Sequence, residues 1–303
     1  MHEALRTEEH TLGAMLEQRD LILVTGKGGT GKSTLVAALA ELAARVRGRA
    51  VAVELAVHPR LHTLVAPGGK VQIVNLELEE ATSRALARML GMPALVGAIT
   101  KNRIIRQFIR TSPAARETIL LDELLARVEA ESKAHVPVIV DLPATGHAVT
   151  FLDTPRAVKK MLRVGPIAAA AEKAEILLHD PARTELVVVA LPEELPINET
   201  IELVKKAREI GISTRRIVVN QVPPHPVEPH ERELLDVVQQ HGEGAVGAFA
   251  KTAHGDTQGA DQARSLIEKL HQSVTSAQII ELPRTLAVEP RASVEAAMKV
   301  LGR

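Results

Sequence analysis

Short apolar runs alternate with longer amphipathic stretches along most of the chain. Runs rich in β-branched residues predict strands, and the stretches between them repeat their apolar positions at helical spacing. Several runs are apolar almost throughout, as strands covered on both faces should be. The predicted strands span 21–25, 50–55, 71–76, 136–141, 186–191, 216–221 and 277–282; the predicted helices span 32–46, 197–210, 259–271 and 293–301. This order predicts an α/β fold, a mostly parallel sheet flanked by helices.

One interval, 79–134, interrupts the alternation and reads as a helical insertion. It contains an apolar stripe and a basic face, followed by a second amphipathic helix over 119–128. These stripes either pack on one another and on the sheet, or form a hydrophobic surface for a client or partner. The stripe consists of Leu95, Ala98, Ile99, Ile105, Phe108 and Ile109, and the basic face of Lys101, Arg103, Arg106 and Arg110.

The rest of the chain reads as one domain. We expect an N-terminal helical extension over 1–18 and a single domain over 19–303 that carries the insertion. In the clearest helical pattern, Asn198 is the expected N-terminal residue and Gly211 the stop signal. The Pro-rich stretch 223–229 is expected to be a rigid surface connection.

Composition excludes several classes of function. The 303 residues include no cysteine, which rules out disulfides, thiolate zinc sites and iron–sulfur clusters. Lys plus Arg equals Asp plus Glu at 37 each, and the only aromatic residues of the Phe, Trp and Tyr types are three Phe, so nucleic acid is not an expected partner. His58 and His62 lack an evident third ligand for a metal, and His225 and His230 lie in a Pro-rich stretch, so neither pair is an expected metal site.

No apolar run approaches the roughly 20 residues that cross a bilayer, so an integral membrane protein is not expected. The N-terminal segment carries Glu3, Glu8, Glu9 and Glu17 and lacks the apolar core of a secretory signal. We therefore expect a cytoplasmic protein.

The strongest chemical signal is a glycine-rich loop between a predicted strand and a predicted helix. Its sequence satisfies G-x-x-x-x-G-K-[ST], whose backbone N–H groups wrap a phosphate at the positive end of a helix. Lys32 should reach the β- and γ-phosphates, and Ser33 should bind Mg²⁺. The pattern predicts a P-loop NTPase whose nucleotide is surrounded by Gly26, Lys27, Gly28, Gly29, Thr30, Gly31, Lys32, Ser33 and Thr34.

A second acidic position fits the same site. The run 136–141 ends in Asp141, at the edge where open α/β sheets bind ligands, and Asp141 should hold Mg²⁺ opposite Ser33. Pro143, Gly146 and His147 follow it, and we expect them to form a loop that changes shape when the γ-phosphate leaves.

Two motifs carry a resemblance to a known family. The loop G-K-G-G-T-G-K-S resembles the deviant P-loop of the MinD, ParA, nitrogenase iron protein and arsenical-pump class, in which the early lysine, here Lys27, reaches across a dimer interface to the partner's nucleotide. The segment Asp-Leu-Pro-Ala-Thr-Gly-His from Asp141 is similar to switch II of the arsenical-pump (ArsA-like) ATPases, with Pro and Ala exchanged. That family includes the eukaryotic tail-anchored-protein targeting ATPase, and the resemblance spans most of 21–301.

The resemblance implies ATP as the nucleotide. It gives Asn220, in Val-Val-Asn-Gln, the recognition of adenine, for which an amide offers both donor and acceptor. The segment 280–290 resembles the loop that cradles adenine, with Pro283 and Arg284 as its wall; a plain strand-to-helix connection is the alternative.

Switch I departs from the family pattern. The family carries an acid there that orients the attacking water, and our alignment places Ala56 at that position. Losing such a group costs about 10² to 10⁴ in rate, roughly 3 to 5 kcal/mol. Glu54, on the same side of the strand, or His58 are candidates to replace it. We expect nucleotide binding with hydrolysis that is slow or depends on a partner subunit.

Together these features predict an ArsA-like switch ATPase that binds Mg-ATP as a dimer, with itself or with a paralogue, and controls a partner or client protein. Two alternatives stay open: a hydrolysis-deficient scaffold subunit paired with an active paralogue, and a membrane-protein targeting chaperone. The sequence names neither the client nor the pathway.

Overall fold

A seven-stranded, all-parallel sheet forms the centre of the protein, in the order β3-β2-β4-β1-β5-β6-β7. The computed structural model describes residues 11–55, 59–90, 96, 102–225, 227, 229–241, 243–286 and 289–302. The strands are β1 Leu21–Gly26, β2 Ala50–Glu54, β3 Val71–Asn75, β4 Val138–Asp141, β5 Thr184–Ala190, β6 Arg216–Val222 and β7 Gln278–Pro283. This sheet and its flanking helices confirm the predicted P-loop NTPase fold class.

The strand predictions hold because parallel strands buried on both faces are apolar along their whole length. Each predicted strand is present, with its ends moved by two residues or fewer. Alternate side chains separate into two cores: Leu21 and Leu23 face one side of β1, and Ile22 and Val24 face the other.

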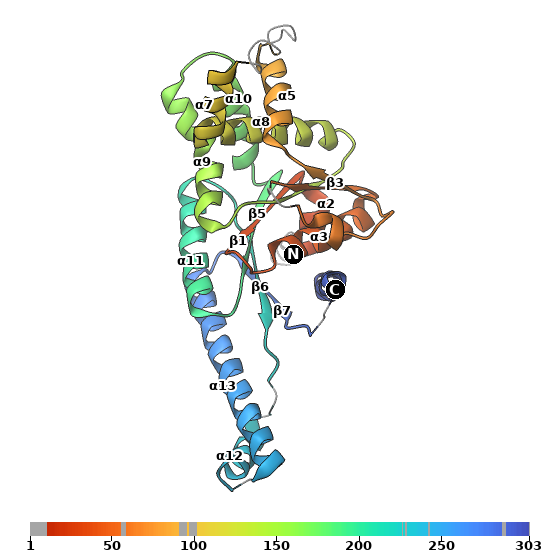
Figure 1. Ribbon diagram of the computed structural model, residues 1–303, viewed down its shortest axis with the longest axis vertical. Helices are drawn as coiled ribbons and strands as arrows, with labels where there is room; N and C mark the ends of the chain where they lie inside the picture. Colours follow the sequence, from red (N-terminus) through yellow and green to blue (C-terminus); the bar gives the residue numbers. More distant parts are fainter. Residues whose placement is uncertain are drawn as a thin grey trace, which may run out of the picture.

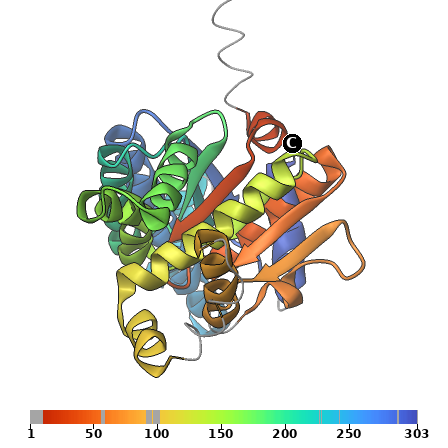
Figure 2. The ribbon, with the colours of Figure 1, turned by 90° about the horizontal axis from the view of Figure 1, so that it is seen from above.

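Helices cover both faces of the sheet (Figures 1 and 2). One core joins the sheet to α8, α9, α10, α11 and α13, and the other joins it to α2, α3, α4 and α14. The helices are α2 Leu12–Gln18, α3 Lys32–Arg47, α4 Leu61–Leu64, α5 Leu78–Leu90, α7 Arg103–Thr111, α8 Pro113–Ser132, α9 Thr145–Met161, α10 Pro166–His179, α11 Glu194–Glu209, α12 Arg232–His241, α13 Gly244–Ser273 and α14 Pro290–Leu301, with a 3₁₀ turn at Pro229–Glu231.

Three predicted helices begin later than those observed, and one of them is α14, which starts at Pro290 where the prediction starts at 293. Helix α11 begins at Glu194, so Asn198 lies inside it; Pro196 is tolerated because the first turn needs no N–H donors. Helix α13 has 30 residues and begins at Gly244, fifteen positions before the predicted start. Its early half contains several glycines and few periodic apolar residues, which hid it. With α12 it extends away from the sheet as a helical arm (Figure 1).

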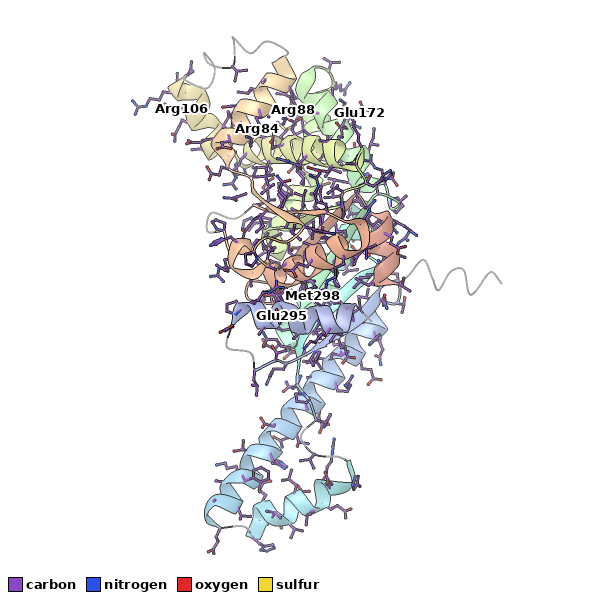
Figure 3. All side chains as sticks on the ribbon, turned by 90° about the vertical axis from the view of Figure 1, so that its right-hand side faces the viewer. Arg84, Arg88, Arg106, Glu172, Glu295 and Met298 are labelled. Atoms are coloured by element: carbon purple, nitrogen blue, oxygen red, sulfur yellow. The ribbon has the colours of Figure 1, made fainter. Side chains whose placement is uncertain are left out.

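Helices α5, α7 and α8 of the interval 79–134 lie at the opposite end of the molecule from that arm (Figures 1 and 3). Arg84 and Arg88 of α5 pair with Asp122 and Glu123 of α8 at distances between 2.7 and 3.1 Å. Ala81, Ala85, Ile109 and Ile119 form a small core between α5, α7 and α8. Helix α8 therefore fixes the insertion to the sheet, because its other face belongs to the main core.

The burial of these helices decides, for part of the interval 79–134, whether its apolar stripes pack inside the protein or form an exposed surface for a client. Within 119–128 the apolar residues Ile119, Leu121, Leu124, Leu125 and Val128 are buried, so this stripe is not a client surface. Ile109 is also buried, whereas Ile104 is 79% exposed. Leu95, Ala98, Ile99 and Lys101 lie outside the described residues, as do the side chains of Ile105, Phe108 and Arg110.

An ion pair attaches α14 to α3, and both helices lie on the same face of the sheet. Arg291 donates to both carboxylate oxygens of Glu41 on α3, at 2.8 Å from Nη2 to Oε2, and to the carbonyl of Leu64 at 2.8 Å. The N–H of Ala66 donates to Glu41 as well, at 2.8 Å. Burial raises the pKa of Glu41, but the bonds from Arg291 and Ala66 outweigh it and lower the pKa overall.

Glu41→Gln is therefore expected to lower the free energy of unfolding by about 1 to 3 kcal/mol at neutral pH, because charged hydrogen bonds are lost. A carboxyl whose pKa is lowered on folding stabilises the protein above its unfolded pKa, and that stabilisation disappears as the pH falls through the folded pKa. Urea denaturation should thus show a deficit at neutral pH that shrinks at a pH below the ordinary glutamate value of 4.5. Glu295→Gln, which removes an exposed partner of the same arginine, should have little effect.

Candidate nucleotide-binding site

The glycine-rich loop connects β1 to α3 at the carboxyl edge of the sheet. Gly31 immediately precedes the helix with φ of 94°, and a Cβ there would lie 2.4 Å from Nδ2 of Asn220. A Cβ at Gly26 would lie 2.1 Å from the carbonyl oxygen of Val189. Only glycine fits these two positions, so the loop can approach the end of β5 and turn into α3.

The loop is also held by its own polar groups. The carbonyl of Lys27 accepts hydrogen bonds from Oγ1 of Thr30 at 2.9 Å and from Nζ of Lys32 at 3.1 Å. Burial lowers the pKa of Lys32, and the neighbouring Asp141 opposes that shift. The Lys32 amine therefore sits inside the loop, where the β- and γ-phosphates of a P-loop nucleotide bind.

Ser33 and Asp141 meet at the end of β4. Ser33 donates its hydroxyl to Oδ2 of Asp141 at 2.5 Å, although the residues are 108 positions apart. Burial raises the pKa of Asp141; the hydrogen bond from Ser33 and the charge of Lys32 oppose that shift, and the charge of Glu54 adds to it. The structure thus brings together a hydroxyl, a carboxylate and a lysine at one point of the sheet edge.

Glu54 lies beside this group but makes other bonds. It is the partner of Asp141 in the register between β2 and β4, and its side chain is buried. Its oxygens accept the backbone N–H groups of Arg60 at 2.7 Å and Leu61 at 3.2 Å, which fixes the start of α4. These bonds fix the direction of the carboxylate, and each oxygen keeps a second lone pair that could accept from a water. The other switch I residues, Ala56 and His58, lie outside the described residues.

The loop after Asp141 is shorter than the sequence predicts. Thr145, Gly146 and His147 belong to the first turn of α9, so the prediction that Gly146 and His147 lie in a loop is wrong. Only 142–144 separates β4 from this helix. The hydroxyl of Thr25, at the end of β1, donates to the carbonyl of Pro143 at 3.1 Å and links the two phosphate-side segments.

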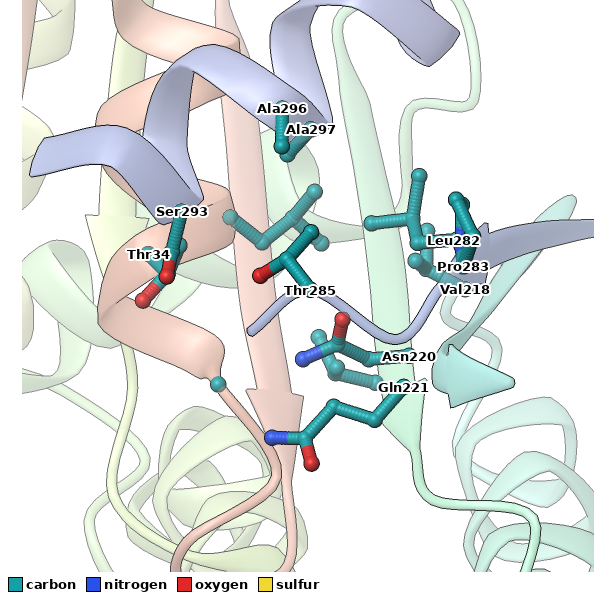
Figure 4. A pocket seen from close by; sticks show the side chains of 13 residues that line it. Thr34, Val218, Asn220, Gln221, Leu282, Pro283, Thr285, Ser293, Ala296 and Ala297 are labelled. Carbon is teal, nitrogen blue, oxygen red and sulfur yellow. The ribbon is translucent and has the colours of Figure 1, made fainter. Parts of the chain in front are cut away.

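A cavity of about 200 Å³ opens beside the glycine-rich loop, between α3, β6, β7 and α14. Asn220 enters it from β6, Thr34 from α3 and Ser293 from α14 (Figure 4). Nδ2 of Asn220 donates to the carbonyl of Thr30 at 2.9 Å, so this amide touches the loop directly. Pro283 also lines the cavity, whereas Arg284 lines a neighbouring one together with Glu193 and Leu286.

Several known proteins are similar in sequence to this chain. ATPase BagA of Mycobacterium tuberculosis H37Rv is 30% identical over 230 residues, which cover 70% of this chain and 67% of the relative. The family described as anion-transporting ATPase matches residues 164–240. The chain belongs to the ArsA-like family of ATPases.

Two further relatives of this ArsA-like ATPase show how far the similarity extends. The arsenical pump-driving ATPase of Escherichia coli is 28% identical over 212 residues, covering 67% of this chain and 35% of that protein. ATPase GET3 of Chaetomium globosum is 26% identical over 273 residues, covering 71% of this chain and 76% of that protein.

Sequence reasoning missed several residues around the site of the ArsA-like ATPase. Leu282, Thr285, Ser293, Ala296 and Ala297 line the same cavity as Asn220, and Glu199 pairs with Lys27. Leu282 and Thr285 lie within the segment 280–290 that resembles the adenine loop, and the other three follow it, so extending that segment into α14 would have found them. Glu199 lies in the segment 191–200, which also resembles the family, but the resemblance gave it no role, and only the folded arrangement brings it to the loop.

Asn220→Ala in the ArsA-like ATPase is expected to weaken ATP binding about five- to thirtyfold, because one or two neutral hydrogen bonds of about 1 kcal/mol each are lost. Binding of ATP and GTP should be compared by titration calorimetry. If Asn220 recognises adenine, ATP loses affinity and GTP does not; if it only supports the loop through Thr30, both weaken equally. Gln221→Ala, which removes the neighbouring amide of the same cavity, is the control.

Proposed function

We propose that this ATPase is a nucleotide-controlled dimeric switch that binds Mg-ATP, hydrolyses it slowly and thereby controls a partner or client protein. Its membership of the family establishes a nucleotide-dependent ATPase. The observation that supports the switch is the contact between Ser33 and Asp141, which joins the nucleotide loop to the strand end that leads into α9. A phosphate that changes this contact would act on both segments.

In this proposal the nucleotide lies along the loop from Gly26 to Thr34. Lys32 neutralises the β- and γ-phosphates, and the backbone N–H groups of the loop and of the α3 N-terminus bind the phosphate oxygens. Asn220 recognises adenine, and Pro283 lies at the cavity wall, with Arg284 beyond it.

The residues present fit a magnesium ion. Ser33 and Asp141 supply the hydroxyl and the carboxylate that P-loop NTPases offer to Mg²⁺, whose remaining ligands are phosphate oxygens and water. Among the described residues no group of three or more acidic or histidine side chains forms a metal site by itself, which agrees with an ion that arrives with ATP. Mg²⁺ would neutralise the developing phosphate charge, and Ser33 and Asp141 would orient it.

We propose that the dimer places the P-loops of two chains face to face, with Lys27 of each reaching the other's nucleotide. Lys27 is about one-third exposed, so its amine is accessible from outside the chain. The partner is a second copy or a paralogue. We place the protein in the cytoplasm, where ATP is present, and expect no nucleic-acid partner.

A catalytically inactive subunit is the form of this proposal that Ala56 favours. The chain would then bind ATP and close on an active paralogue without hydrolysing its own nucleotide. Lys27, Lys32, Ser33 and Asp141 favour hydrolysis that is slow, not absent.

A targeting chaperone is the second candidate, and one surface favours it. The turn between α9 and α10 exposes Met161 at 80%, Leu162 at 43% and Val164 at 87%. This apolar turn lies outside the interval 79–134, whose stripes are the predicted client surface. None of the helices within the described parts of the chain combines the length and the apolar character needed to cross a bilayer. A hydrophobic helical peptide that binds only with ATP present would favour this function.

The test is ATP turnover by the purified chain with Mg²⁺, with mass in solution recorded under ATP, ADP and no nucleotide. The expected result is slow turnover that Lys32→Ala abolishes, and a doubled mass with ATP only. ATP binding and dimerisation without any turnover would favour the inactive subunit. A chain that binds no ATP, or stays monomeric alone and with ATP-binding paralogues, would contradict the proposal.

A further inference from the structure

Lys27 is paired within its own chain. Its Nζ lies 3.3 Å from Oε1 of Glu199, on the second turn of α11, and both side chains are about one-third exposed. No other ion pair of Lys27 occurs among the described residues. The lysine that the proposed dimer needs at the partner's nucleotide is therefore held over the surface of its own subunit.

Both ends of this pair are fixed in place. The carbonyl of Lys27 accepts bonds from Thr30 and Lys32, which holds the backbone from which the lysine side chain leaves. Helix α11 buries Ile197 and Thr200 on either side of Glu199 in the sequence. Nζ of Lys269 on α13 donates to Oδ1 of Asn198 at 2.8 Å, so α11 is also attached to the neighbouring helix.

The strength of the pair suits a reversible contact. An ion pair as exposed as this one contributes about 0.2 to 1 kcal/mol, which is enough to direct a flexible lysine side chain. A partner's triphosphate carries several negative charges in a closed interface and would compete successfully for the same amine. The pair can therefore orient Lys27 without preventing the lysine from moving to the partner's nucleotide.

We infer that Glu199 is a positioning residue: it holds Lys27 on its own subunit in the nucleotide-free chain and releases it when the nucleotide of a second chain arrives. This inference rests on the proposed dimer for the release, but not for the holding. Glu199 stabilises only the open state, so removing its charge shifts the equilibrium towards the closed dimer.

The holding is tested on the nucleotide-free chain with a carbodiimide, which joins an amine to a carboxylate only where the two are in contact. Mass spectrometry should find a Lys27–Glu199 crosslink, and it should decrease severalfold with Mg-ATP. Lys159 and Glu175, an ion pair of 2.7 Å elsewhere, serve as the internal standard that nucleotide leaves unchanged. Absence of the Lys27 crosslink where the standard forms would overturn the inference.

The release is tested with Glu199→Gln against Glu202→Gln, which removes the same charge from an exposed position on the same helix. At low salt, Glu199→Gln should tighten ATP-dependent dimerisation about two- to fivefold, and the gain should fade at high salt because exposed charges are screened. Glu202→Gln should not change it. Equal effects of the two variants, or a weaker dimer with Glu199→Gln, would overturn the release.

These outcomes separate the two ideas. If the wild-type chain never dimerises with nucleotide, the proposed function fails and the release fails with it, while the crosslink still decides whether Glu199 holds Lys27. If the wild type dimerises and Glu199→Gln behaves as Glu202→Gln does, only the inference fails. ATP affinity of the monomer should be the same in both variants.

Discussion

Ala56→Asp is expected to raise the rate of ATP hydrolysis about 10²- to 10⁴-fold. The resemblance to the family implies an acid at this position that orients the attacking water, and such a group contributes roughly 3 to 5 kcal/mol to the transition state. Glu54, the acid nearest to it in the sequence among the described residues, is held at the start of α4 by the N–H groups of Arg60 and Leu61. The wild-type chain should therefore turn over slowly, measured as phosphate release under saturating Mg-ATP.

The matched control for this change is Ala56→Asn, which has the same shape without the negative charge and should restore little. Lys32→Ala in the Ala56→Asp background should abolish the gain, which ties the new activity to this site. Affinity for ATP should change little, because the acid acts on the water and not on the bound nucleotide. Fast turnover by the wild type, or no gain with aspartate, would show that another group already orients the water.

Glu54→Gln separates the two roles that Glu54 can have. A glutamine keeps one carbonyl oxygen for the N–H groups at the start of α4 but cannot act as a base. If Glu54 orients the water in the wild type, this variant loses the residual turnover. If Glu54 only fixes α4, turnover persists.

The structural elements that could be predicted from the sequence are those whose conformation is determined by residues close together in the chain. The buried strands are apolar along their length, and the glycines of the loop indicate its conformation. The sheet and the position of the P-loop could therefore both be predicted. Helix α9 and the first half of α13 could not, because Pro155 lies inside α9 and several glycines lie in the first half of α13. Their stability comes from packing on the sheet and on neighbouring helices, which overrides local preference.

Contacts between residues far apart in the sequence could be predicted only where motifs assign both residues to the same site. The pairing of Ser33 with Asp141 was expected because both belong to motifs whose chemistry requires them at one ion. Lys27 and Glu199 are 172 positions apart and only Lys27 has a role in a motif, so the sequence does not connect them. The sequence thus locates the nucleotide, whereas the groups that direct its loop become visible only in the fold.

A buried charge cluster at the opposite edge of the sheet gives the largest expected effect on stability. Glu185 on β5 is fully buried and accepts from Nη1 of Arg216 on β6, and Nε of Arg19 lies 3.6 Å from its other oxygen. Arg216 also donates to the carbonyl of Thr11 at 2.6 Å, which attaches the segment before α2. Burial lowers the pKa of Arg19, and Glu185 opposes that shift. One carboxylate therefore compensates two buried cations.

Glu185→Leu is expected to lower the free energy of unfolding by about 3 to 5 kcal/mol, because it leaves two arginines in the interior without their shared acid. Urea denaturation of the nucleotide-free chain measures this loss. The triple variant Arg19→Met, Glu185→Leu, Arg216→Met removes all three charges and should recover most of it, since an apolar cluster of similar volume has no charge to desolvate. ATP affinity of the folded protein should stay unchanged in both, because the cluster lies where the strands begin and the nucleotide site where they end. A Glu185→Leu loss below about 1 kcal/mol would mean that water or rearranged carbonyls already solvate the arginines, and the cluster would then be no constraint on the fold.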